Sequence, residues 1–136
     1  MIGVVVVTHG QLATELVTAT ETIVGDLPQF AAVAIGWHED TGDAREEIAA
    51  AIGRVNQGQG VLILTDMFGG TPSNLSMTFL TQGQVEVITG VNLPMLIKLA
   101  GMIAKADDLL AVAREIREQG RNSIWVASDL LRGEKT

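Results

Sequence analysis

Cysteine is absent from this 136-residue sequence, and aromatic residues make up only 4% of it. Without cysteine the chain has no disulfides, thiol nucleophiles or thiolate metal ligands, which fits a reducing compartment. Because aromatic residues are scarce, the 47% of hydrophobic residues must build a core of Val, Ile, Leu and Ala. This length and apolar content predict a single folded domain.

Clustered basic residues and long apolar runs are also missing. The nine Lys and Arg residues are scattered, and the formal net charge is −7, so the basic surface on which nucleic-acid binding depends is lacking. The apolar run at residues 4–7 is too short for a signal peptide, and no run is long enough to cross a bilayer. We expect a soluble, cytoplasmic protein that binds no nucleic acid and does not insert into a membrane.

Apolar runs alternate with amphipathic segments along most of the chain. We expect strands at residues 2–7, 30–35, 61–64, 85–88 and 123–127, and helices at 11–24, 43–56, 72–80, 95–103 and 107–119. This alternation is typical of an open, mostly parallel α/β sheet with helices on both faces. We predict the strand order 2-1-3-4, one domain over residues 1–128, and a polar tail over 129–136 that frays.

One stretch in the middle of the chain combines an acidic residue, a glycine turn and a helix start. Asp66 follows a buried strand, and Gly69 and Gly70 precede Thr71-Pro72. Thr71 suits the N-cap of the next helix, and Pro72 suits its first position. Backbone N–H groups at a glycine turn and a helix N-terminus bind anions. We therefore predict that Gly69, Gly70 and Thr71 bind a phosphoryl group.

His9 follows the first strand as Asp66 follows the third. In a sheet of the predicted order, the site lies beyond the carboxyl ends of these two strands, so the two side chains should meet. Neutral imidazole is a good nucleophile near pH 7, and a carboxylate that accepts from one ring nitrogen fixes the tautomer. We predict His9 as the nucleophile and Asp66 as the carboxylate that orients it.

Each of these residues also has a purely structural interpretation, as a hydrogen-bonded histidine, a cap or a turn. A metal site built from His9, His38 and Asp66 has no recognised ligand spacing, so no metal and no cofactor is expected, and His38 is interpreted as a solvated loop residue. A receiver domain phosphorylated on Asp66 would need an acidic pair after the first strand. A hydrolase using Ser73 would need a Gly-x-Ser-x-Gly motif. Neither feature occurs in the sequence.

The chain resembles the IIA domain of the mannose-type bacterial sugar phosphotransferase system. The matching residues are His9-Gly10, the block at 66–74 and the block at 90–95, in the same order and spacing as in that family. The resemblance covers about residues 1–127, and the block at 66–74 is its most specific part. The related subunit of dihydroxyacetone kinases shares the early histidine but is expected to lack the Gly-Gly-Thr-Pro sequence.

The resemblance implies a phosphotransferase component with a phosphohistidine intermediate, a half-reaction carrier rather than a complete enzyme. His9 would take a phosphoryl group on Nε2 from the histidine-containing phosphocarrier protein and pass it to a IIB component in sugar uptake. Asp66 would orient His9, and the Thr71 hydroxyl would lie near the phosphoryl group. A regulatory sensor or adaptor whose partner binding depends on phosphorylation of His9 is the alternative, and the sugar is left open.

The resemblance also implies a homodimer, in which the last strand, Ile124-Trp125-Val126, is an antiparallel edge strand of the partner's sheet. An edge strand of the chain's own sheet is the alternative. Because the sequence stops at Thr136, a free-standing IIA component is expected.

Overall fold

The computed structural model describes residues 1–36 and 40–133. The elements are, in chain order, β1 (Gly3–His9), α1 (Leu12–Val24), β2 (Phe30–Ile35), α2 (Thr41–Val55), β3 (Val61–Thr65), α3 (Thr71–Met77), β4 (Val85–Thr89), α4 (Leu93–Met102), α5 (Leu109–Asn122) and α6 (Ala127–Leu131). The first four strands and the helices between them lie where the sequence predicts, within a few residues. None of the described helices is long and apolar enough to cross a membrane.

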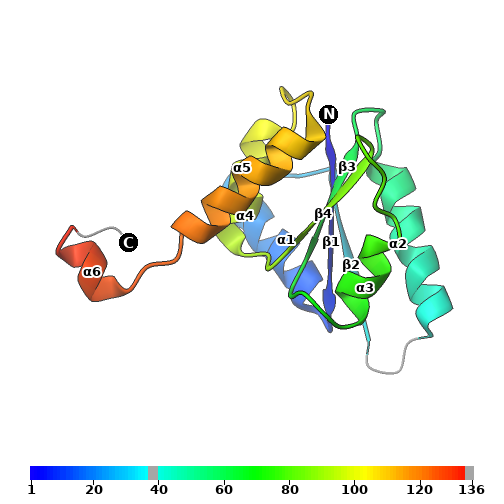
Figure 1. Ribbon diagram of the computed structural model, residues 1–136, viewed down its shortest axis with the longest axis horizontal. Coiled ribbons are helices and arrows are strands. Elements are labelled where there is room, and N and C mark those ends of the chain that lie inside the picture. Colours follow the sequence, from blue (N-terminus) through cyan, green and yellow to red (C-terminus); the bar gives the residue numbers. More distant parts are fainter. Residues whose placement is uncertain (37–39, 134–136) are drawn as a thin grey trace.

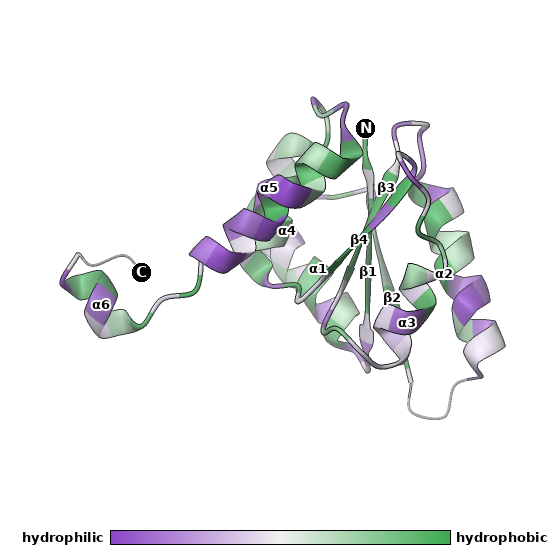
Figure 2. Cartoon of the chain, in the orientation of Figure 1, coloured by the Kyte–Doolittle hydropathy of each residue, from purple (hydrophilic) through white to green (hydrophobic). Residues whose placement is uncertain are grey.

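The four strands form one parallel sheet in the order β2-β1-β3-β4, which confirms the predicted order. Helices α1, α4 and α5 cover one face, and α2 and α3 cover the other (Figure 1). Every residue of β3 is buried, and in β1 only the last residue, His9, is exposed. The apolar strands therefore occupy the centre of the molecule, while hydrophilic residues lie on the outer helix surfaces (Figure 2). This burial on both faces explains why β1 and β3 are continuous apolar runs.

Residues 123–127, predicted as the last strand, form no strand within the described chain, so the alternative of an edge strand in the chain's own sheet is wrong. Residues 124–126 are irregular and lead into α6, which has no buried residue and projects away from the sheet (Figure 1). A strand forms only where a neighbour takes up its backbone hydrogen bonds, and the described residues supply no such neighbour to this segment. Helix α6 crosses the predicted boundary between domain and tail, and residues 134–136 of that tail lie outside the described residues.

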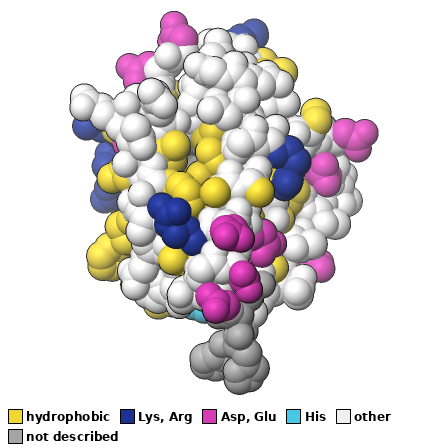
Figure 3. Space-filling view, turned by 90° about the vertical axis from the view of Figure 1, so that its right-hand side faces the viewer, with side chains coloured by type: hydrophobic (Ala, Val, Ile, Leu, Met, Phe, Trp, Pro, Cys, Tyr) yellow, Lys and Arg dark blue, Asp and Glu magenta, His cyan; other side chains and the backbone are white. Residues whose placement is uncertain are grey.

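The outer edge of β4 is largely open. β4 pairs with β3, and on its other side the described residues supply only a single antiparallel bridge, between Thr81 and Val85. Half-buried Val85, Val87 and Phe79 pack against the same core cluster, and the Arg45 guanidinium lies 4.5 Å from the centroid of the Phe79 ring. Apolar side chains also gather on the side of the molecule that carries α2 and α3, with charged groups around them (Figure 3). An open edge beside apolar side chains is a surface on which another strand can pair.

Candidate functional site

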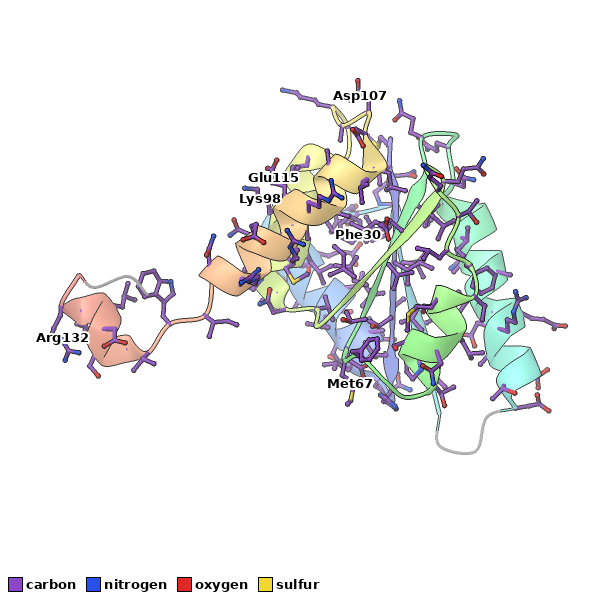
Figure 4. The ribbon with its side chains drawn as sticks, viewed as in Figure 1. Phe30, Met67, Lys98, Asp107, Glu115 and Arg132 are labelled. Carbon is purple, nitrogen blue, oxygen red and sulfur yellow. The ribbon has the colours of Figure 1, made fainter. Side chains whose placement is uncertain are left out.

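The topology brings His9 and Asp66 to the same edge of the sheet. His9 is the last residue of β1, and Asp66 directly follows β3, the neighbouring strand. Val7 of β1 is paired with Thr65 of β3, so the two strands end side by side at this edge of the sheet. Met67, the next residue after Asp66, lies at this end of the molecule, opposite the end that carries Asp107 (Figure 4). The predicted meeting of His9 and Asp66 is therefore confirmed.

Asp66 holds His9 through both its ring and its backbone. Oδ2 of Asp66 lies 2.7 Å from Nδ1 of His9 and accepts the His9 backbone N–H at 3.0 Å. Oδ1 accepts the backbone N–H of Met67 at 3.0 Å. An ionised carboxylate can only accept hydrogen bonds, so we assign the ring proton to Nδ1, which leaves the lone pair on Nε2.

The two side chains differ in how far they are exposed. The His9 side chain is 51% exposed, whereas that of Asp66 is 14% exposed. Another protein can therefore reach the imidazole, while the carboxylate beneath it is shielded from water.

The environment of Asp66 keeps it ionised. Partial burial acts to raise the pKa of Asp66, but the hydrogen bonds from the ring and backbone of His9, the charge of His9 and the hydrogen bond from Met67 outweigh it. The net result is a pKa below the ordinary value of 3.8. At neutral pH the group facing Nδ1 is therefore a carboxylate, which supports the tautomer assigned above.

The glycine turn lies against the free ring nitrogen. Gly70 has φ +93°, and a Cβ placed on it would lie 3.3 Å from Nε2 and from Cε1 of His9. Gly70 is the N-cap of α3 and Thr71 is its first residue, so the prediction of Thr71 as the N-cap is wrong by one position. Within residues 1–36 and 40–133, no group accepts a hydrogen bond from the amides of Gly70 and Thr71. These two donors are thus available to an anion on Nε2.

Gly69 is placed differently from the other two residues predicted to bind phosphate. Its N–H donates to Oγ of Ser73 at 3.1 Å. The sequence pattern suggests Ser73 only as a candidate nucleophile, and this contact is not among the predictions. The sequence does contain a signal for this contact. Ser73 is a hydroxyl residue three positions after the N-cap Gly70, where the side chain of a capping box bonds to the backbone before the helix.

A cavity of about 540 Å³ opens beside the imidazole. Among the described residues, its walls come from the ends of β1 and β2 and the starts of α2 and α3, and they include His9, Gly10, Ile35, Gly36, Thr41, Gly70 and Thr71. Two of the three predicted phosphoryl-binding residues, Gly70 and Thr71, therefore share this cavity with His9.

Two exposed apolar side chains next to Asp66 were not singled out from the sequence. Met67 is 56% exposed and Phe68 is 74% exposed. Large apolar side chains with this exposure beside a polar site are typical of protein-binding surfaces. No three acidic, His or Cys side chains of the described residues are grouped closely enough to hold a metal ion, and His38 lies outside those residues.

An open parallel sheet with a carboxylate-oriented histidine at its switch point defines the class of site, and comparison with known proteins defines the family. The family described as "PTS system fructose IIA component" matches residues 3–116. The chain belongs to this mannose-type family of IIA components of the phosphotransferase system.

Individual relatives agree with this assignment. The chain is 31% identical over 130 residues to the mannose-specific EIIAB component of Escherichia coli K12, with 88% of the chain but only 38% of that protein covered. It is 29% identical to the fructose-specific EIIA component of Bacillus subtilis 168, covering 100% of the chain and 93% of that protein. The structure of a mannose/sorbose-specific IIA subunit from Enterococcus faecalis has a TM-score of 0.81 and 26% identity, with 92% and 93% of the two chains covered.

Proposed function

We propose that this protein is a phosphoryl carrier in sugar uptake and that His9 is the residue phosphorylated. The observation that carries the proposal is the 2.7 Å contact between Nδ1 of His9 and Asp66, which leaves Nε2 free and facing Gly70. Membership in the IIA family supports the same assignment.

The reaction needs only one bond to form and one to break. The Nε2 lone pair attacks phosphorus, and the bond from phosphorus to the donor's histidine nitrogen breaks, returning its electron pair to that nitrogen. Positive charge that develops on the imidazole is stabilised by Asp66. The amides of Gly70 and Thr71 and the Thr71 hydroxyl receive the phosphoryl oxygens. The same steps in reverse release the group to the next acceptor.

The partners of this cycle are the histidine-containing phosphocarrier protein as donor and a IIB component as acceptor, both in the cytoplasm. The half-exposed imidazole, with Met67 and Phe68 beside it, offers a protein-binding surface rather than a closed pocket. The relatives are described for mannose, fructose and sorbose, so the family does not select one sugar for this chain.

A homodimer accounts for the exposed C-terminal segment. Ile124, Val126 and Leu131 are 74%, 65% and 87% exposed. The open edge of β4 and the apolar side chains near it form a complementary surface. We propose that a second copy of the chain covers both, and that this replaces the missing intramolecular pairing.

Transfer of labelled phosphate tests the carrier role. The chain is incubated with phosphoenolpyruvate, enzyme I and the phosphocarrier protein, and we expect acid-labile, base-stable label that a IIB component removes. His9→Ala should abolish the label, whereas His38→Ala, the change of the other histidine, should leave it intact. Stoichiometric label on the His9→Ala chain would contradict the proposal.

A further inference from the structure

Ser73 occupies a buried position behind the glycine turn. It is the third residue of α3 and has no exposed surface, and its Oγ accepts the N–H of Gly69 at 3.1 Å. Gly70, the N-cap of α3, has no side chain with which to cap the helix. A side chain near the start of the helix thus reaches back to the turn that precedes it, as the acidic or amide residue of a capping box does.

Local backbone preference does not by itself fix the conformation of the turn at Gly69 and Gly70, which Ser73 contacts. Gly69 and Gly70 both have positive φ, +88° and +93°. Two adjacent glycines have the widest choice of backbone conformations, so their arrangement has to be fixed by contacts. The carbonyl of Gly70 is fixed by the N–H of Asn74 at 3.0 Å, and the N–H of Gly69 is fixed by Ser73.

The position of this turn determines what His9 faces. Gly70 lies against Nε2 and Cε1, and its amide and that of Thr71 are the donors available there. If Gly69 were released, the turn could rotate and move both donors relative to Nε2. Displacements of about 1 Å in such positioning groups can cost up to about 100-fold in rate.

We propose that Ser73 is a positioning residue for phosphoryl transfer, which acts by holding Gly69 so that the amides of Gly70 and Thr71 stay aimed at Nε2 of His9. This inference rests on the proposed function. Among the described residues, the Ser73 side chain forms its hydrogen bond with Gly69, so Ser73 acts through the turn.

The structure offers a matched control on the same helix. Ser76 is also fully buried, but its Oγ has no hydrogen-bond partner among the described residues. Ser73→Ala and Ser76→Ala thus remove the same atom from the same helix, and only the first removes the contact to Gly69. The full-length chain is used for both, and thermal unfolding monitored by circular dichroism establishes that each variant folds.

The kinetic test measures single-turnover transfer from the phosphorylated phosphocarrier protein at increasing donor concentration. For Ser73→Ala we expect the rate at saturating donor to fall about 10-fold or more. The donor concentration for half-maximal rate should change little, because Met67 and Phe68 are untouched. Ser76→Ala should match the wild type in both quantities.

An NMR measurement separates positioning from general loosening. In Ser73→Ala the Gly69 amide and the His9 ring resonances should shift, while in Ser76→Ala both stay in place. A Ser73→Ala chain with wild-type transfer, or with slow transfer but unmoved His9 resonances, would overturn the positioning role. In either case phosphorylation of the wild type leaves the carrier proposal standing. A wild-type chain that takes no phosphate would instead overturn the carrier proposal, and the role of Ser73 with it.

Discussion

A single carboxylate oxygen of Asp66 accepts two hydrogen bonds from His9, one from the ring at 2.7 Å and one from the backbone at 3.0 Å. The hydrogen bond to the backbone fixes the position of the His9 main chain, and the hydrogen bond to the ring fixes the orientation of the imidazole. His9 is therefore placed by one neighbour, although half of its side chain is exposed. Changes at Asp66 should alter the chemistry of His9 more than the fold.

Asp66→Asn should slow phosphoryl transfer while leaving the protein folded. The amide can donate to Nδ1 as well as accept from it, so the imidazole can adopt the tautomer whose lone pair is on Nδ1 instead of Nε2. We expect a fall of about 100-fold or more in single-turnover transfer. Asp107→Asn, at the opposite end of the molecule (Figure 4), is the control and should transfer at the wild-type rate. Unchanged transfer in Asp66→Asn would refute the orienting role.

The Asp66 carboxyl should titrate below its ordinary value of 3.8. His9→Ala should raise that pKa, because the ring hydrogen bond and the charge of His9 are lost while partial burial persists. Since the pKa is lower in the folded state, ionised Asp66 stabilises the fold above the unfolded value, and this contribution is lost as pH falls through the folded pKa. Carbon-13 NMR titration of the side-chain carboxyl measures both variants. An equal or lower pKa in His9→Ala would contradict this account.

Gly70→Ala should both strain the backbone and displace the imidazole. The φ of +93° disfavours alanine, and the added Cβ would lie 3.3 Å from Nε2 and Cε1 of His9. We expect a loss of about 1 to 3 kcal/mol in unfolding free energy, from denaturant titration, together with slower transfer. Gly83→Ala is the control, because Gly83 has φ +74° with nothing within 4 Å of a Cβ. It should lose comparable stability and keep full transfer, and a rate loss shared by both variants would count against a contact effect.

Removal of the C-terminal segment should convert a dimer into a monomer. A chain ending at Asn122 lacks the exposed apolar residues 124, 126 and 131 but keeps all of α5. Sedimentation velocity should give a dimer for the full chain and a monomer for the truncated one. With Trp37 replaced by Phe, Trp125 becomes the sole tryptophan, and its emission should shift to the red on dilution as the dimer dissociates. A full-length chain that is monomeric at all concentrations would exclude the homodimer.

The sheet could be predicted from the sequence because its signals are local. The apolar runs of β1 and β3 are buried on both faces, and glycine, proline or a capping residue marks most helix ends. The pairing of His9 with Asp66 followed from topology, since parallel strands in the order β2-β1-β3-β4 place these two strand ends side by side.

The conformation of residues 124–126 and the contact of Ser73 could not be predicted from local sequence patterns. Ile124-Trp125-Val126 has the composition of a strand, but a strand needs a second backbone to pair with, and the part of the chain that the structure describes supplies none there. Oγ of Ser73 accepts the N–H of Gly69 in a partly buried contact that depends on the turn between them. The sequence by itself determined the class of fold, the four strands and the two groups that meet at their ends. Only the tertiary structure decided which amides remain available at Nε2 and which apolar segments stay uncovered, because hydrogen bonds and burial are shared between segments that the sequence keeps apart.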